Sequence, residues 1–262
     1  MSIAEKLQTI AQNEQRVYNA GYEKGKSDGG DTETAYNQGL EEGKQAEYDR
    51  FWDNYQQNGK RTDYTNAFSG NGWNENTLKP KYDVIPIQTV NMFRGNVMEV
   101  NISDFLKEQG VKLDFSKATV LSETLLYSSI TGVGVVDARN AANLNYAFSR
   151  STGLETIRLL ILKDNGSQTF STNTFIACPN LKNITIQGVI GQNFYIQDSP
   201  LLTIESMKSI INALKNYSGT SYELTYAVSF PSGCWDKLEA SGTAPNGDTW
   251  RDYVTYELGW NT

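Results

Sequence analysis

The sequence predicts an α+β fold in which an N-terminal helical arm is followed by a short solenoid of irregular repeats and a C-terminal capping helix. Three patterns predict it. A heptad-like apolar pattern runs through residues 1–26, an apolar spacing recurs four times between residues 93 and 186, and an amphipathic helical pattern follows Thr203. We therefore expect an attachment or oligomerisation arm at 1–58, an irregular N-terminal cap at 59–90, and a repeat domain with its C-terminal cap at 91–262.

The arm carries two helical patterns. The first is a single heptad track with the apolar residues Ile3, Leu7, Ile10 and Val17. This track fits a short coiled coil that makes a homo-oligomer, or a helix that packs on the same chain or on a neighbouring protein. The second has aromatic residues at positions i, i+3, i+4 and i+7, namely Tyr48, Phe51, Trp52 and Tyr55. Such a stripe predicts a helix with a docking face.

Residues 59–90 place large aromatic side chains among polar turn residues and prolines. The aromatic residues are Tyr64, Phe68, Trp73 and Tyr82. A solenoid needs its first open surface covered, and a few large side chains can cover it. We expect this stretch to be an irregular cap.

The repeated pattern is a large apolar residue followed by apolar-x-x-apolar-x-apolar. Its four copies are Phe93 with Val97, Val100 and Ile102; Leu126 with Ile130, Val133 and Val135; Phe148 with Leu154, Ile157 and Leu159; and Phe175 with Leu181, Ile184 and Ile186. This is the rhythm of leucine-rich repeats, in which one short strand per repeat points its apolar side chains into a shared core.

Beyond residue 191 the pattern changes. Strands are predicted at Phe194–Ile196 and from Tyr222 to Phe230. Helices are predicted from Thr203 to about Tyr217 and at 249–258, each preceded by a residue suited to cap it.

Composition excludes several classes of function. The net charge of −7 and the lack of a Lys/Arg run argue against nucleic-acid binding. Two cysteines and no histidine exclude a disulfide scaffold and offer no metal-ligand spacing, and Cys178 reads as a core residue. Nucleophile-elbow, phosphate-loop and dinucleotide motifs are absent. We therefore expect no enzymatic activity, no cofactor and no metal site.

The sequence also bears on location. Its first residues are charged, without an apolar stretch that would make a secretory signal, and no apolar run is long enough for a membrane span. We expect synthesis in a cytoplasm without a signal peptide.

Several segments resemble known proteins. "TFIACPNLKNITI" resembles the repeat of BspA-like leucine-rich-repeat proteins, although the first three copies lack the Cys and the first two are more tightly spaced. "AGYEKGKSDGG", "YDRFWDNYQQNGKRTDY", "AFSGNGW", "LKPKYD" and the final "ELGW" resemble repeat proteins encoded in prophages of Gram-positive bacteria. This resemblance implies a virion protein, in or near the tail, with an attachment arm and a binding module.

The hypothesis from the sequence is therefore a non-enzymatic phage structural protein of the virion, such as a tail or fibre component. Its partners would be other virion proteins, through the N-terminal helices, and a host surface protein or glycan. The alternatives are a bacterial surface adhesin or general protein-interaction module, and a glycan-acting enzyme. The candidate binding residues are the polar positions within the repeats, unless these are ordinary solvated strand residues: Glu155, Thr156, Arg158, Lys182, Asn183 and Thr185.

Overall fold

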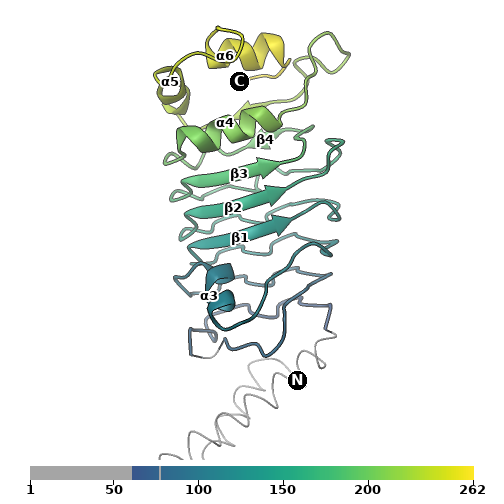
Figure 1. Ribbon diagram of the computed structural model, residues 1–262, viewed down its shortest axis with the longest axis vertical. Helices are drawn as coiled ribbons and strands as arrows, with labels where there is room; N and C mark the ends of the chain where they lie inside the picture. The colour runs from purple at the N-terminus through teal and green to yellow at the C-terminus, as the bar shows by residue number, and fades with distance from the viewer. Residues whose placement is uncertain (1–60, 77) are drawn as a thin grey trace, which may run out of the picture. The chain divides into compact units, whose positions relative to one another are not determined.

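The computed structural model describes residues 61–76 and 78–262 of the 262-residue chain (Figure 1). The predicted helical arm at 1–58 lies outside the described residues. The chain divides into two compact units, Met1–Arg61 with Lys79–Tyr82, and Thr62–Leu78 with Asp83–Thr262. The strands and helices of the described residues belong to the second unit.

Two small parallel sheets organise this unit. The larger contains β1 (Gly132–Asp137), β2 (Thr156–Ile161) and β3 (Asn183–Gln187) in that order, and Figure 1 shows the three arrows pointing the same way. Val133, Ile157 and Ile184 are paired across it and buried. The smaller sheet pairs β4 (Phe194–Tyr195) with β5 (Val228–Ser229). Aliphatic and β-branched residues suit these strands because one face of each is buried.

Five short helical segments accompany the sheets in the described residues. They are α3 (Ile102–Glu108), α4 (Ile204–Ala213), α5 (Cys234–Glu239), α6 (Trp250–Asp252) and the π-helix η1 (Tyr253–Glu257). The side chain of Thr203 accepts a hydrogen bond from the Ser206 N–H at the start of α4, as the sequence predicts. This helix ends earlier than expected, because Leu214 turns to extended backbone and forms a parallel bridge with Ile190.

The prediction of a leucine-rich-repeat solenoid is wrong. The unit is α+β with a few short parallel strands and little helix, and a continuous series of repeat strands is not found among the described residues. The first predicted copy forms no strand: Val97 is 50% exposed, and Ile102 begins α3. The reason is local, since the Asn101 side chain accepts hydrogen bonds from the N–H groups of the next turn and starts a helix there.

The second and third predicted copies contain strands but place the wrong residue in the core. Val135 is 45% exposed and Leu159 is half-buried, whereas Val136 and Leu160 are buried. Ile157 of β2 pairs with Ile184 of β3, and Leu160 pairs with Ile186. Two residues of β2 therefore lie opposite one residue of β3. This β-bulge turns two adjacent side chains, Arg158 and Leu159, away from the core. The predicted strand from Tyr222 to Phe230 is likewise reduced to β5, because residues before it form turns.

The core beside the strands is a column of aromatic rings. Phe148 stacks on Phe175 with ring centroids 5.2 Å apart, and Phe175 lies 5.4 Å from Phe194. Cys178 is buried next to this column, and its Sγ donates to the Phe148 carbonyl oxygen at 2.9 Å. Burial raises the pKa of the Cys178 thiol to about 12, so this cysteine is an unreactive core residue at neutral pH.

A series of turns outside the strands stack on one another through backbone hydrogen bonds. The N–H groups of Gly70, Gly95, Tyr127 and Arg150 each donate to a carbonyl of the next turn, at 2.7 to 3.0 Å. These four residues, followed by Ala177, share a left-handed backbone conformation with φ between 52° and 81°. A second left-handed column lies four residues earlier and holds Asn66, Asn91, Glu123 and Tyr146. This conformation destabilises residues other than Gly by about 1 kcal/mol or more, and it destabilises Asn less than bulky residues.

Candidate functional site

The outer face of β2 and β3 carries the residues that the sequence nominates. Thr156, Arg158, Asn183 and Thr185 alternate with buried aliphatic residues, and Glu155 and Lys182 immediately precede the two strands. We call these six residues the outer sheet face. Lys182 Nζ lies 3.0 Å from Glu155 Oε2, and Asn183 Nδ2 lies 3.5 Å from Thr156 Oγ1. The parallel register thus brings Glu155 beside Lys182 and Thr156 beside Asn183, whereas the Arg158 side chain pairs with Asp104 of α3.

Helices close both edges of the three-stranded sheet. Figure 1 shows α3 below β1 and α4 above β3. Ser103 Oγ of α3 accepts the Gly134 N–H at 2.8 Å. At the other edge, Ser206 and Ser209 of α4 accept the N–H groups of Ile184 and Ile186 at 2.9 and 2.8 Å. These hydroxyls satisfy the edge N–H groups of Gly134, Ile184 and Ile186, so a partner strand cannot pair at those positions. The face of the sheet is therefore the surface that we consider for a partner.

The glycines of β1 allow α3 to lie directly on this strand. A Cβ at Gly132 would stand 2.6 Å from Asn101 Nδ2, and a Cβ at Gly134 would stand 3.0 Å from Ser103 Cβ. The start of α3 therefore occupies space that side chains would fill on a normal strand. The outer surface of β1 is covered in part, whereas the outer surface of β2 and β3 is open.

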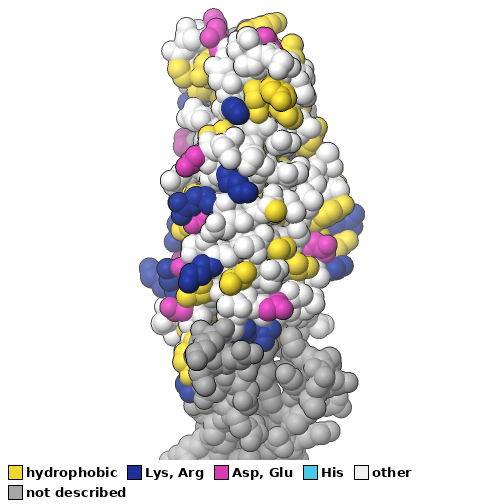
Figure 2. Space-filling view, turned by 90° about the vertical axis from the view of Figure 1, so that its right-hand side faces the viewer, with side chains coloured by type: hydrophobic (Ala, Val, Ile, Leu, Met, Phe, Trp, Pro, Cys, Tyr) yellow, Lys and Arg dark blue, Asp and Glu magenta, His cyan; other side chains and the backbone are white. Residues whose placement is uncertain are grey.

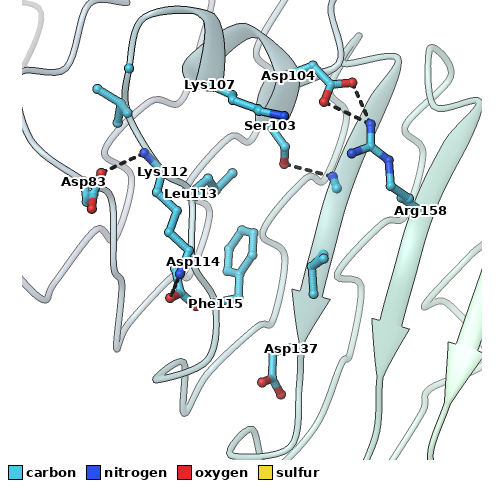
Figure 3. A pocket seen from close by; sticks show the side chains of 14 residues that line it. Asp83, Ser103, Asp104, Lys107, Lys112, Leu113, Asp114, Phe115, Asp137 and Arg158 are labelled. Atoms are coloured by element: carbon cyan, nitrogen blue, oxygen red, sulfur yellow. Dashed lines mark hydrogen bonds and ion pairs between the residues drawn. The ribbon is translucent and has the colours of Figure 1, made fainter.

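A cavity of about 620 Å³ lies between α3, the loop after it and the outer surface of β1 (Figure 3). Its apolar lining comes from Val111, Leu113, Phe115 and Val135. Its polar lining comes from Asp83, Ser103, Asp104, Lys107, Lys112, Asp114, Asp137 and Arg158. Arg158 belongs to both the outer sheet face and this cavity, so the two form one continuous candidate site.

The charges around the cavity are held in short contacts. Arg158 Nη2 lies 2.9 and 2.8 Å from the two carboxylate oxygens of Asp104 (Figure 3). Lys112 Nζ lies 2.7 Å from Asp114 Oδ2, and the Lys112 N–H donates to Asp83 Oδ1 at 2.8 Å. These contacts hold oppositely charged groups in place, so a ligand meets an ordered polar surface.

Two carboxyl groups at the cavity are ionised more readily than usual. Partial burial raises the pKa of Asp114, but hydrogen bonds from Lys112 and Ser116 outweigh it and lower the pKa to about 2. Hydrogen bonds from Arg139 lower the pKa of Asp137, against partial burial. Both groups therefore carry negative charge throughout the neutral range, and neither is suited to donate a proton there.

We expect Asp114→Asn to lower the free energy of unfolding by about 1 kcal/mol at pH 7, because Asp114 is stabilised as the charged form and only partly screened by water. The folded pKa is about 2 and the ordinary value is 3.8. The stabilisation is therefore complete above the ordinary value and is lost as the pH falls toward 2. Urea unfolding at several pH values measures it, with exposed Glu99→Gln as the control. A wild-type advantage that persists unchanged at pH 2 would contradict this assignment.

Other features bear on the class of site. Within residues 61–76 and 78–262, no cluster of three or more His, Cys, Asp or Glu side chains is placed to hold a metal ion. The helices of the described part are also too short and too polar to cross a membrane. Figure 2 shows Lys, Arg, Asp and Glu side chains gathered along its left-hand edge, the side on which β1–β3 face the viewer in Figure 1.

The sequence missed the cavity and most of the residues that line it. Ser103 and Asp104 directly follow the first predicted repeat copy, which ends at Ile102, and no helix was predicted there, so their approach to β1 and β2 was not foreseen. The signal was Asn101 followed by Ser-Asp at the start of an amphipathic segment, which is a helix-start pattern. No protein-family model, curated protein or solved structure matches this chain.

Proposed function

We propose that this chain is a non-enzymatic structural protein of a phage particle, a tail, fibre or other virion component, that binds a protein or host surface through its outer sheet face. The observation that carries the proposal is the placement of six polar residues on, or immediately before, the neighbouring strands β2 and β3, in a sheet with a helix at each edge. An accessible polar face on a fixed backbone is what a surface-binding module needs.

The geometry favours recognition by a face over insertion into a deep pocket. Neighbouring strands bring side chains of equivalent register within about 5 Å of one another, which forms rows of hydrogen-bonding groups. Thr156 and Asn183 form one such row, and Glu155 and Lys182 stand beside it. The ion pair between Arg158 and Asp104 places the guanidinium at the border of the cavity. Preorganised groups of this kind lose less conformational entropy when a partner binds.

The particle assignment rests on the resemblance of the N-terminal segments and the closing "ELGW" to prophage-encoded proteins. It is tested by inducing the strain that encodes the chain, purifying the particles and identifying their proteins by mass spectrometry. We expect the chain in particles at a constant ratio to a major tail protein. Its absence from particles, with presence on the bacterial surface, would replace the proposal with the adhesin alternative.

For the binding role, we expect the double variant Arg158→Ala with Asn183→Ala to bind cells of the encoding strain at least tenfold more weakly than the native chain, measured with fluorescently labelled protein. Central polar and arginine contacts often dominate such interfaces. The fold should tolerate the change, because both side chains are exposed and an exposed ion pair adds at most about 1 kcal/mol. Arg251→Ala, in α6, is the matched control. Equal binding by the double variant and the native chain would exclude this face.

A further inference from the structure

A second surface group lies on the stacked turns and shares no residue with the outer sheet face or the cavity. It consists of Arg94, Glu123, Tyr127, Tyr146 and Arg150, which we call the turn patch. Tyr127 and Tyr146 are 49% and 41% exposed, although large aromatic side chains in this unit are mostly buried. Exposed aromatic residues surrounded by charged ones are typical of interaction surfaces.

Two arginines of the turn patch face the same tyrosine. Arg150 Nη1 donates to Tyr127 Oη at 2.9 Å, and its Cζ lies 5.3 Å from the ring centroid. Arg94 Cζ lies 6.0 Å from the same centroid. Arg94 is also 3.3 Å from Glu123 Oε2, whereas Arg150 has no carboxylate within 4.0 Å among the described residues. The patch therefore keeps one ordered guanidinium whose charge is not paired within the described part.

The two turns that carry most of the turn patch, residues 123–127 and 146–150, hold bulky residues in left-handed backbone conformations. Gly70 and Gly95 occupy the left-handed positions equivalent to Tyr127 and Arg150. In the other column, Asn66 and Asn91 precede Tyr146. The chain thus uses Gly and Asn, which suit this conformation, in the first two turns, bulky side chains at residues 123, 127, 146 and 150, and Ala at residue 177. Strain of this kind is characteristic of functional sites.

Buried polar atoms without partners in the described part of the chain also lie at the turns formed by residues 123–127 and 146–150. Ser128 Oγ, Asn145 Oδ1 and Ser149 Oγ are buried side-chain atoms without a hydrogen-bond partner among residues 61–76 and 78–262. Each is adjacent in sequence to Tyr127, Tyr146 or Arg150. Unpaired buried polar atoms and bulky residues in left-handed conformations both lower the stability of the fold, so stability does not explain why they are present. Their coincidence with the exposed tyrosines and arginines indicates that this region serves binding.

We propose that the turn patch is a second interaction surface, which binds an acidic, extended segment of a partner protein. A partner carboxylate would pair with Arg150, and an apolar partner side chain would lie against Tyr127 and Tyr146. Two arginines and one glutamate give the patch a net positive charge within a chain of net charge −7, so it favours acidic partners. Tyrosine and arginine are the residues most enriched at the centres of protein interfaces, which favours a protein partner over a polysaccharide.

The test uses the full chain and a defined probe, the fluorescein-labelled peptide amide Glu-Glu-Trp-Glu-Glu, followed by fluorescence anisotropy at low salt. We expect binding that the matched Gln-Gln-Trp-Gln-Gln peptide lacks. Arg150→Gln should weaken binding at least fivefold. The variant with Tyr127→Gly and Tyr146→Asn, which restores residue types used in the earlier turns, should weaken it at least tenfold while leaving the thermal unfolding midpoint unchanged or higher. Arg251→Gln is the control, because Arg251 stacks on Trp235 at 5.3 Å in another part of the unit.

Three results would overturn the proposal. If the chain binds the Glu and Gln peptides equally, or binds neither peptide, the proposed preference for an acidic partner is wrong. Binding of hyaluronan, a carboxylate-bearing polysaccharide, in place of the Glu peptide would assign the patch to a glycan. A large fall in the unfolding midpoint of the tyrosine variant, with peptide binding intact, would make the tyrosines structural. None of these results depends on the outer sheet face or on particle association, so this proposal and the proposed function can fail independently.

Discussion

Phe175→Ala should lower the free energy of unfolding by about 4 kcal/mol, as expected when a fully buried phenylalanine is truncated. The Phe175 side chain is 1% exposed and lies between two other rings, 5.2 Å from Phe148 and 5.4 Å from Phe194. The substitution removes both ring contacts and leaves a cavity that the stacked turns cannot close. Since small domains are stable by only about 5–15 kcal/mol, this loss is a large share of the total. Urea unfolding followed by tryptophan fluorescence measures it.

Two further variants separate ring loss from general perturbation. Phe175→Leu keeps much of the volume and should cost about 1.5 kcal/mol. Tyr256→Ala removes an aromatic side chain that is 69% exposed and should change stability by less than about 0.5 kcal/mol. If Phe175→Ala were as stable as Tyr256→Ala, the aromatic column would not be the core of this unit.

The sequence predicted the third strand of the sheet well and the first two less well. The apolar spacing selects buried Leu181, just before β3, and then Ile184 and Ile186 on the buried face of β3, because that strand has a regular alternation. In β2 the same spacing selects Leu159, while Leu160 fills the core. A β-bulge is a change in backbone pairing. Leu159 and Leu160 are both apolar, so either could face the core, and the apolar pattern alone could not locate the bulge.

The candidate site was predictable in part, for a related reason. Polar residues that alternate with buried strand positions face outward, and Arg158 and Asn183 are indeed exposed on β2 and β3, whereas their role in binding stays a prediction. The turn patch was not predicted, because Tyr127 and Tyr146 resemble core aromatics in a sequence. Their exposure follows from the left-handed turn positions they share with Gly95 and Asn91, and that equivalence is visible only when the turns are stacked.

The second large effect is expected at the close approach of two turns just before β1 and β2. A Cβ at Gly153 would lie 2.2 Å from the carbonyl oxygen of Ser129 and 2.6 Å from its carbonyl carbon. Both are backbone atoms, and hydrogen bonds hold the chain on either side, from the Ser129 N–H to Asn96 O at 2.7 Å and from the Glu155 N–H to Thr131 O at 2.8 Å. We expect Gly153→Ala to cost at least about 3 kcal/mol, the upper end for overpacking, because no side chain can move aside to relieve the clash.

Comparison with two other glycines isolates the steric origin of this effect. Gly219 has φ of +69° and open space around its Cβ position, so Gly219→Ala should show conformational strain alone, about 1 kcal/mol. Gly188 combines φ of +95° with a Cβ position 2.4 Å from the Leu162 carbonyl oxygen, so Gly188→Ala should be at least as destabilising as Gly153→Ala. Thermal and urea unfolding of the three variants gives the order. A Gly153→Ala cost no larger than that of Gly219→Ala would mean that the turns before β1 and β2 separate easily, and the register that aligns Thr156 with Asn183 would then need another support.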